Sequence, residues 1–271
     1  MNSDMLEQLH QTLDEILDYA SNVCEQNGLT YVLLYGSALG AYRHHGFIPW
    51  DDDLDIGLPR ADYEKLLRIL AEHPDPRYSI QNEENESNYF LSFSKIRKND
   101  TLFVENYVGR RYKNNGAFID VFPLDEVDDP NAIAQKLHGK HIRYLIHSLR
   151  FSVYHALYRQ KQGKVRYLMD SILTAPARVG AASAKLRRLQ RLMQRGGHAG
   201  APFIAQFDDT SAAQMIPRDV YFPARQLEFN GKMRWVPGQI EKYLTLAYGS
   251  DYMQLPPPGS RRTHEPLELK L

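Results

Sequence analysis

The chain has 271 residues, 43% of them hydrophobic, and 33 basic residues against 33 acidic ones. This composition indicates a globular protein with a substantial core and excludes a chain that is disordered over most of its length. The one cysteine excludes a disulfide framework within the chain, and the lack of a long apolar run or a signal-peptide pattern predicts a cytoplasmic protein.

The first part of the chain has both helix and strand patterns. Apolar residues at every third or fourth position predict an amphipathic helix from about residue 4 to residue 26, ended by Gly28. The short apolar run at residues 31–35 predicts a buried strand. A second helix is expected after Pro59, which suits a first helical turn, and before Pro74.

The middle of the chain changes from strand patterns to helix patterns. β-Branched and aromatic residues favour strands at residues 89–98, 101–104 and 117–122. From residue 131 to about residue 195 only helices are expected, with a break at Pro176 and Gly180.

The last part of the chain carries clear turn signals. An Asn-Gly pair between alternating residues predicts a hairpin over residues 227–237. A helix is expected over residues 240–249. The proline-rich stretch 255–266 is expected to be extended, because proline fixes φ and lacks an amide donor.

Four aspartates lie within five positions in the segment WDDDLDIG. Most acidic runs are solvated loops, but the apolar neighbours of this one indicate a strand packed on a core. In an extended segment Asp51, Asp53 and Asp55 share one face, and Asp52 lies on the other. Carboxylates this close repel one another, so they predict a site for a hard cation, Mg²⁺ or Mn²⁺, with Asp51 as an auxiliary ligand.

A further aspartate, Asp120, stands in the strand-like segment FIDVFPLD. A buried carboxylate needs a cation or hydrogen-bond donors, so we expect Asp120 beside the first group. There it either completes the coordination of the ion or takes the proton from an attacking hydroxyl. The alternative is an aspartate that accepts a hydrogen bond in a turn before Pro123.

The order of these features resembles the arrangement of the nucleotidyltransferase superfamily: a strand, Gly-Ser, a helix, a strand with Asp-Leu-Asp, and a later strand with one more Asp. In this arrangement Gly36 lets the backbone approach a phosphate, and Ser37 with the following helix N-terminus donates to the phosphate oxygens. Asp53 and Asp55 then hold Mg²⁺ against those oxygens. The 15 residues between Ser37 and Asp53 are slightly more than is usual in the superfamily.

Four segments in chain order resemble the LicD family of phosphocholine transferases, whose relatives include fukutin and fukutin-related protein: GSALGAYRHHGFIPWDDDLDIG, SFSKIRKNDT, GAFIDVFPLD and YGSDYMQLPP. The resemblance runs from about Tyr31 to His264 and includes the longer connection before the aspartates. It implies transfer of a phospho-alcohol, typically phosphocholine from CDP-choline, to a sugar hydroxyl of a surface glycan precursor such as lipopolysaccharide or teichoic acid, with release of CMP. His264 matches a histidine near the family's C-terminus and is expected to fold back over the site.

The donor and the activity leave alternatives open. The first alternative is the same chemistry with another donor, such as CDP-ribitol or CDP-glycerol, or nucleotidyl transfer. The second alternative is an inactive glycan-binding or scaffold protein with the same fold. A nucleic-acid binder that uses basic helices is the least favoured of these alternatives. The intact set of Gly36, Ser37, Asp53, Asp55 and Asp120 favours an active enzyme, because an inactive copy need not keep all five.

Three cations are expected to offset charge on the departing CMP: Arg43, Lys95 and Arg97. Lys95 and Arg97 share one face of a strand, and the alternative for all three is an ordinary salt bridge. The rings of Trp50 and Tyr42 are candidates to cover cytosine or a choline ammonium, although aromatic residues beside a site more often serve packing.

Charge is unevenly distributed along the chain. Residues 131–200 carry fourteen Lys or Arg and one acid, Asp170, so their charge is about +13, and the remainder carries about −13. We expect this stretch to dock on the anionic inner face of a membrane, where lipid-linked glycan acceptors reside. The alternatives are that these basic residues pair with acidic residues in the rest of the chain, bind an anionic acceptor, or bind nucleic acid.

These patterns together predict an α+β fold with a nucleotidyltransferase-like mixed sheet flanked by helices. A basic, mostly helical region is inserted before a C-terminal hairpin and helix. We divide the chain into a catalytic core at residues 1–130, the basic helical region at residues 131–200, and residues 201–271, which complete the catalytic domain with the hairpin, the helix and an extended tail.

Overall fold

The computed structural model describes residues 2–86, 89–106, 108–109, 112–153, 163–175, 182–207, 215–261 and 263–271. The strands of its main sheet are β1 (Val32–Leu33), β2 (Asp55–Pro59), β3 (Tyr78–Gln81), β4 (Ser94–Lys98), β6 (Phe118–Val127), β7 (Phe203–Ala205) and β8 (Met215–Pro217). Their order is β1-β2-β6-β4-β3, and β6 also pairs with β7, which pairs with β8. Strands β2 and β6 are parallel, and the other pairs are antiparallel. The predicted mixed sheet is therefore confirmed.

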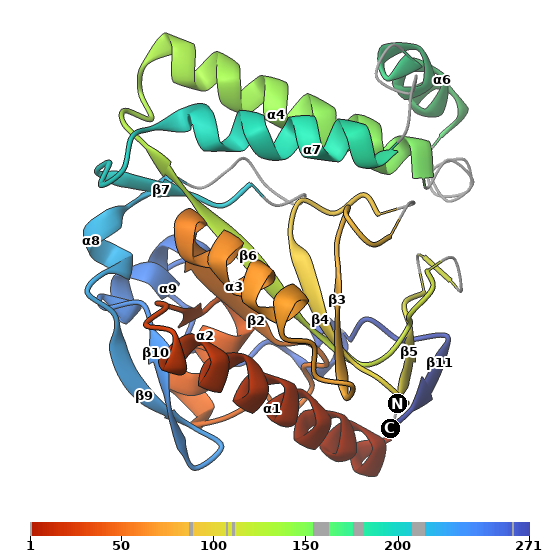
Figure 1. Cartoon of the computed structure of the whole chain (residues 1–271), viewed down its shortest axis with the longest axis vertical. Coiled ribbons are helices and arrows are strands. Elements are labelled where there is room, and N and C mark those ends of the chain that lie inside the picture. The colour runs from red at the N-terminus through yellow and green to blue at the C-terminus, as the bar shows by residue number, and fades with distance from the viewer. Residues whose placement is uncertain are drawn as a thin grey trace.

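Helices cover this sheet (Figure 1). The α-helices of the described residues are α1 (Ser3–Gln26), α2 (Tyr35–His44), α3 (Arg60–Glu72), α4 (Ile133–Val153), α6 (Lys164–Leu173), α7 (Ala182–Met193), α8 (Arg218–Tyr221) and α9 (Ile240–Tyr248), of which α6 lies away from the sheet beside the end of α4. In Figure 1, α3 lies in front of the strands with α1 below it, and α4 and α7 lie together across the upper end of the sheet. The α+β class with flanking helices is confirmed.

Local patterns explain the elements that were predicted correctly. Helix α1 begins where the Asn2 side chain accepts the Met5 amide hydrogen at 2.8 Å, and it buries an apolar stripe that includes Cys24. Strands β9 (Arg225–Phe229) and β10 (Lys232–Val236) form the predicted hairpin. Its turn residues Asn230 and Gly231 both have positive φ, which favours this residue pair in a tight hairpin.

Several short elements were not predicted. The strand expected over residues 89–98 begins only at Ser94, because residues 89–93 are buried without pairing in the sheet. Strand β6 continues through Pro123, and β3, β7, β8 and α8 had no clear pattern. The proline-rich tail turns once at Pro258–Ser260 and then forms β11 (Glu268–Lys270), which pairs with β5 (Leu102–Val104). Strands of two to four residues are too short to show a hydrophobic period.

The basic stretch is helical in its described parts, as predicted, and the expected break at Pro176 and Gly180 lies outside the described residues. Helices α4 and α7 pack on each other and bury Ile142, Ile146 and Leu186 in the same apolar cluster as the sheet. The division of the chain into three parts stays a prediction. Within the described part of the chain, no helix is long and apolar enough to cross a membrane.

Candidate active site

Three charged residues form a row across adjacent strands of the main sheet. Asp55, the first residue of β2, is the register partner of Asp120 on β6, and Asp120 is the register partner of Lys95 on β4. Register partners project from the same face of a sheet. The Lys95 Nζ therefore reaches Asp120 Oδ1 at 2.8 Å. The sheet itself sets this order of charges, because each residue belongs to a paired strand.

Four carboxylates gather at this row, as the aspartate pattern predicted. Asp51 and Asp53 share a hydrogen bond, and burial together with the Asp53 charge raises the pKa of Asp51 to about 8. Burial also raises the pKa of Asp53 and, more strongly, the pKa of Asp55, which lies beside Asp53, Asp120 and Asp51. Burial raises the pKa of Asp120 to about 6 although Lys95 opposes the shift. Burial and mutual repulsion therefore disfavour ionisation of these carboxyl groups, so without a cation they keep their protons to higher pH than an ordinary aspartate.

Asp52 lies next to this group and holds the C-terminal tail, and its expected place on the opposite face of the segment stays a prediction. Its carboxylate is buried and accepts the backbone amide hydrogen of His264 at 2.8 Å, and His264 Nδ1 lies 2.9 Å from Asp52 Oδ1. The hydrogen bond to Asp52 raises the pKa of His264 to about 9. The same Nδ1 atom lies 3.7 Å from Asp53 Oδ2, so the expected folding of His264 over the site is confirmed.

Gly36 and Ser37 place two of the aspartates. The Ser37 hydroxyl oxygen accepts the Asp55 backbone amide hydrogen at 2.8 Å, which fixes the start of β2. A Cβ atom on Gly36 would lie 2.5 Å from Asp51 Oδ2, so glycine is needed for the close approach of that carboxylate. The residue before them, Tyr35, has a φ of 45°, a strained value for a side chain of this size. The predicted contacts of both residues with phosphate stay a prediction.

The two cations of β4 have different surroundings. Lys95 is 1% exposed, pairs with Asp120 and with Glu105 at 3.2 Å, and lies 3.5 Å from the centre of the Phe118 ring. The Arg97 side chain is fully buried and donates to Gln81, to the Gly116 carbonyl oxygen and to Glu105. A guanidinium held inside the protein does not fit the predicted contact of Arg97 with the departing CMP.

Arg43 and Trp50 line a cavity of about 390 Å³, together with Tyr248 and Tyr252. The Arg43 Nη1 donates to the Tyr252 carbonyl oxygen at 2.6 Å, and the Arg261 guanidinium lies 4.3 Å from the centre of the Trp50 ring. The predicted aromatic face of Trp50 is thus covered by a cation of the protein itself.

Tyr42, by contrast, packs edge-on against Tyr252. That contact is packing within the protein. Its predicted role over a base or an ammonium group stays a prediction.

Sequence reasoning missed three residues of this region. Tyr248 connects the cavity to the carboxylates, since burial and the charges of Asp55, Asp51 and Asp53 raise its pKa. His10 lies on α1, and its Nε2 is 2.7 Å from the Asp51 carbonyl oxygen. Glu105 follows β5 directly, and its position at the end of a predicted strand is the sequence feature that could have identified it. Tyr248 lies within a segment that carried the family resemblance, whereas His10 had no signal.

The donor chemistry of the site fits a hard cation. In the residues that the structure describes, no three His, Cys, Asp or Glu side chains close around a single point as metal ligands. Mg²⁺ does not require such a cage, because it usually takes one or two carboxylates and completes its shell with substrate phosphates and water. Clustered carboxylates with raised pKa values are the chemistry that such an ion stabilises.

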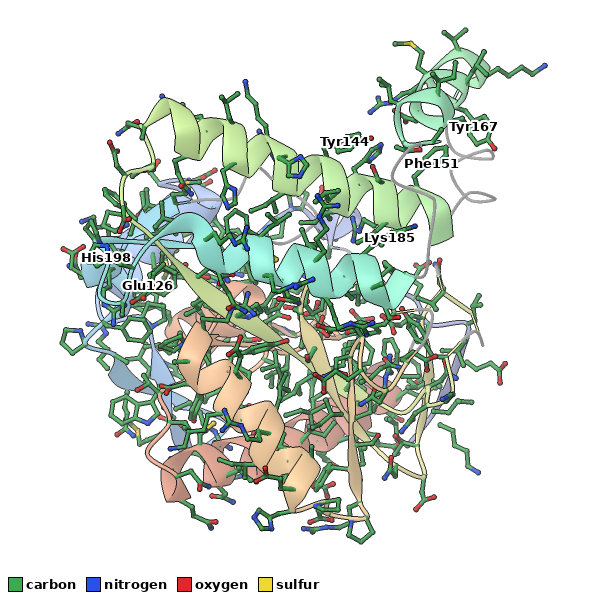
Figure 2. The ribbon with its side chains drawn as sticks, turned by 45° about the horizontal axis from the view of Figure 1, so that its top comes forward. Glu126, Tyr144, Phe151, Tyr167, Lys185 and His198 are labelled. Carbon is green, nitrogen blue, oxygen red and sulfur yellow. The ribbon has the colours of Figure 1, made fainter. Side chains whose placement is uncertain are left out.

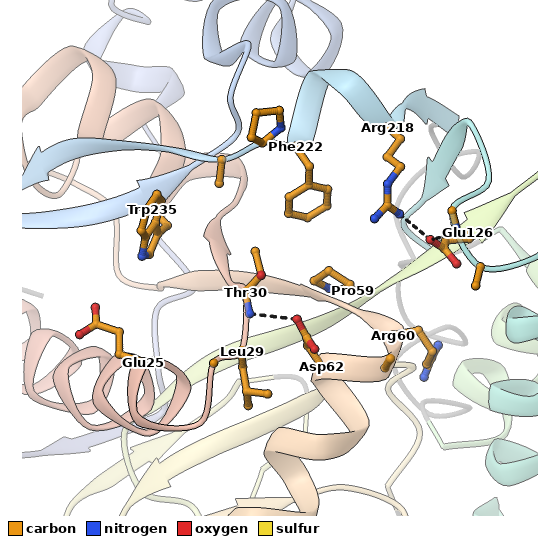
Figure 3. Close-up of a pocket in the computed structure, with 16 residues that line it drawn as sticks. Glu25, Leu29, Thr30, Pro59, Arg60, Asp62, Glu126, Arg218, Phe222 and Trp235 are labelled. Atoms are coloured by element: carbon orange, nitrogen blue, oxygen red, sulfur yellow. Dashed lines mark hydrogen bonds and ion pairs between the residues drawn. The ribbon is translucent and has the colours of Figure 1, made fainter.

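A larger cavity, of about 860 Å³, lies at the opposite end of β2 (Figure 3). Pro59, the last residue of that strand, lines it, together with Phe222 and Trp235. Arg218 and Glu126, which form an ion pair, also line this cavity. The carboxylates described above do not line this cavity, so it is separate from the candidate active site.

Comparisons with known proteins agree with this geometry. Residues 28–150 match the family model described as LicD/FKTN/FKRP, nucleotidyltransferase domain. The chain is 27% identical to lipopolysaccharide cholinephosphotransferase LicD of Haemophilus influenzae over 253 residues, which cover 92% of this chain and 91% of that protein. It is also 44% identical to ribitol 5-phosphate transferase FKRP of Homo sapiens over 52 residues, 19% of this chain and 10% of that protein. An uncharacterized protein of Rickettsia typhi is 25% identical over 61% of this chain and 58% of its own length.

Proposed function

We propose that this chain, which belongs to the LicD family of phosphotransferases, transfers phosphocholine from CDP-choline to a sugar hydroxyl of a surface glycan precursor and releases CMP. The observation that carries this proposal is the row of Asp55, Asp120 and Lys95, with Asp53 beside it. The relatives named as a cholinephosphotransferase and a ribitol 5-phosphate transferase support a phospho-alcohol as the transferred group.

In this proposal Asp53 and Asp55 would hold Mg²⁺ or Mn²⁺, and Asp51 would support them from beside the ion through its contact with Asp53. The ion supplies positive charge that neutralises the donor diphosphate. The carboxylates are placed for this role by the chain itself: the Ser37 hydroxyl fixes the backbone of Asp55, and the missing side chain of Gly36 admits the carboxylate of Asp51.

The transfer replaces one phosphorus–oxygen bond by another. The acceptor hydroxyl oxygen bonds to the β-phosphorus, and the bond between this phosphorus and the oxygen bridging to the α-phosphate breaks, so CMP leaves with the electron pair. We assign the acceptor proton to Asp120, because its pKa of about 6 suits a base that works near neutral pH. Lys95 holds Asp120 Oδ1 and so orients the second carboxylate oxygen.

The cavity beside the aspartates is proposed to receive the donor. Arg43 and Trp50 line it, and both are suited to a nucleoside phosphate, through a guanidinium charge and a ring face. Arg261 occupies the Trp50 ring face in the structure, so a cytosine base or a choline ammonium would replace it there.

A second donor, CDP-ribitol, is favoured by the similarity to a ribitol 5-phosphate transferase. A screen of CDP-choline, CDP-ribitol and CDP-glycerol with Mg²⁺ and a mixed glycan extract, measured as CMP release, distinguishes the donors. We expect the fastest release from CDP-choline. Faster release from CDP-ribitol would move the assignment to the second donor, and no release from any CDP-alcohol would contradict the proposed reaction.

A further inference from the structure

We propose that helix α6 and the adjoining side of α4 bind the surface of an anionic lipid bilayer. Helix α6 has no buried residue, and Figure 1 shows it at the upper right, beside the end of α4. Its apolar face consists of Val165, Leu168, Met169, Ile172 and Leu173, which are 74%, 59%, 57%, 66% and 60% exposed. Four of these residues follow the spacing i, i+3, i+4 and i+7, so they form one continuous stripe.

The other side of α6 packs on α4, which fixes the direction of the apolar face. The rings of Tyr167 and Phe151 lie 5.7 Å apart, and the Tyr144 hydroxyl donates to the Leu173 carbonyl oxygen at 2.8 Å. Figure 2 shows Tyr167 and Phe151 together where the two helices meet. Because these contacts occupy the inner side, the apolar face points away from the protein.

Basic residues surround the apolar face. Lys164 and Arg166 of α6 are exposed, and Lys140 lies four positions before Tyr144 on the exposed side of α4. Leu137, seven positions before Tyr144, is 59% exposed and adds an apolar side chain to the same side. The one acid of residues 131–200, Asp170, belongs to the packed side, with its carboxylate 3.7 Å from His147 Nε2.

This combination favours a lipid surface over other partners. An amphipathic helix that lies in the membrane interface has an apolar side for the acyl boundary and Lys or Arg for anionic headgroups. Nucleic acid would use the basic residues but not an exposed stripe of Leu, Met and Ile. The inference does not depend on the proposed reaction, since binding to vesicles is measured without any substrate.

The test is co-sedimentation of the full chain with phosphatidylcholine vesicles that contain or lack phosphatidylglycerol, at low salt. We expect binding to the anionic vesicles to exceed binding to the neutral ones. The double variant Leu168→Gln/Ile172→Gln should bind about tenfold less, because it removes two side chains from the apolar face. Glutamine keeps the helix propensity, and both sites are exposed, so the unfolding temperature should not change.

The matched control is Met233→Gln/Leu246→Gln, which changes two side chains that are 55% and 45% exposed on the hairpin and on α9. It should bind like the unchanged chain. A charge variant, Lys164→Glu/Arg166→Glu, should lose the preference for phosphatidylglycerol. Equal recovery with neutral and anionic vesicles, no binding to either, or full binding by the α6 variant would each overturn the proposal.

Discussion

Lys95 and Asp120 face each other as register partners on antiparallel strands, and the Lys95 Nζ lies 2.8 Å from Asp120 Oδ1. The same ammonium group lies 3.2 Å from Glu105 Oε1. One buried cation therefore serves two carboxylates, and it does so next to Asp55 on the neighbouring strand. Lys95 is thus a positioning residue for Asp120 as well as a source of positive charge.

Replacing Lys95 by Met tests this double role. The apolar side chain keeps the volume but leaves Asp120 and Glu105 without their shared cation, so the free energy of unfolding should fall by about 3 kcal/mol. The rate of CMP release by the folded fraction should fall about 100-fold. Chemical denaturation and initial rates check both, with Lys242→Met at an exposed position as the control. Unchanged stability and rate would contradict the role of Lys95.

Replacing Arg97 by Met separates a structural cation from a substrate contact. Arg97 is fully buried and donates to Gln81, Gly116 and Glu105, so its loss should lower the free energy of unfolding by about 3–5 kcal/mol. At a temperature where the variant is folded, its KM for the donor should match that of the unchanged chain. A raised KM in the milder variant Arg97→Lys, with unchanged stability, would instead support the contact with the donor.

Divalent ions should stabilise the protein more at pH 8 than at pH 6. Asp51 has a folded pKa of about 8, above its ordinary value, so in chelator the stability it contributes is present below about pH 4 and is lost as the pH rises toward 8. Asp120, with a folded pKa of about 6, changes in the same direction. A bound cation favours the ionised carboxylates, so its stabilising effect grows over this range.

Melting curves with Mg²⁺ and with chelator at both pH values measure this effect. The variant Asp53→Asn should melt higher than the unchanged chain in chelator, because it removes a repelling charge, and should lose most of the shift caused by Mg²⁺. The control Glu72→Gln changes an exposed acid and should keep the shift. An equal Mg²⁺ shift in Asp53→Asn would contradict the assignment of the ion.

The contact between His264 and Asp52 should depend on pH in a defined direction. The folded pKa of His264 is about 9, above the ordinary value near 6.5, so the stability it contributes is complete below pH 6.5 and is lost as the pH rises through 9. Half of the ring is exposed, so screening reduces the contribution to about 1 kcal/mol. The difference in stability between the unchanged chain and His264→Gln should therefore be present at pH 6 and vanish at pH 10. A difference that is constant over this range would contradict the ion pair.

Local patterns in the sequence predicted the residues that one strand or helix positions by itself. The grouping of Asp51, Asp53 and Asp55 was predicted from strand alternation, although β2 begins only at Asp55 and the other two aspartates precede it. Asp120 was predicted from its apolar flanks. The direction in which the Arg97 side chain points could not be derived from the sequence. Its partner Gln81 lies on β3 and its partner Glu105 directly follows β5, and no local pattern shows how these segments are placed relative to β4.

Contacts between distant parts of the chain were also hidden from local patterns. His264 reaches Asp52 across 212 positions. The family resemblance indicated only that His264 folds over the site, and nothing in the sequence predicted its contact with Asp52. The pairing of β5 with β11 and the attachment of β7 and β8 to β6 depend on strands of three residues, which have no period of their own.

The most direct test of the central claim is Mg²⁺-dependent CMP release from CDP-choline in the presence of a glycan acceptor, compared between the unchanged chain and Asp55→Asn. Asp55 begins β2 in register with Asp120, and its replacement by the isosteric amide removes one charge with little change in shape. We predict that the unchanged chain releases CMP with Mg²⁺ and not in chelator, and that Asp55→Asn loses at least about 1,000-fold in rate. Release that is equal in the two proteins, or that persists in chelator, would contradict a metal-dependent phosphocholine transfer at these aspartates.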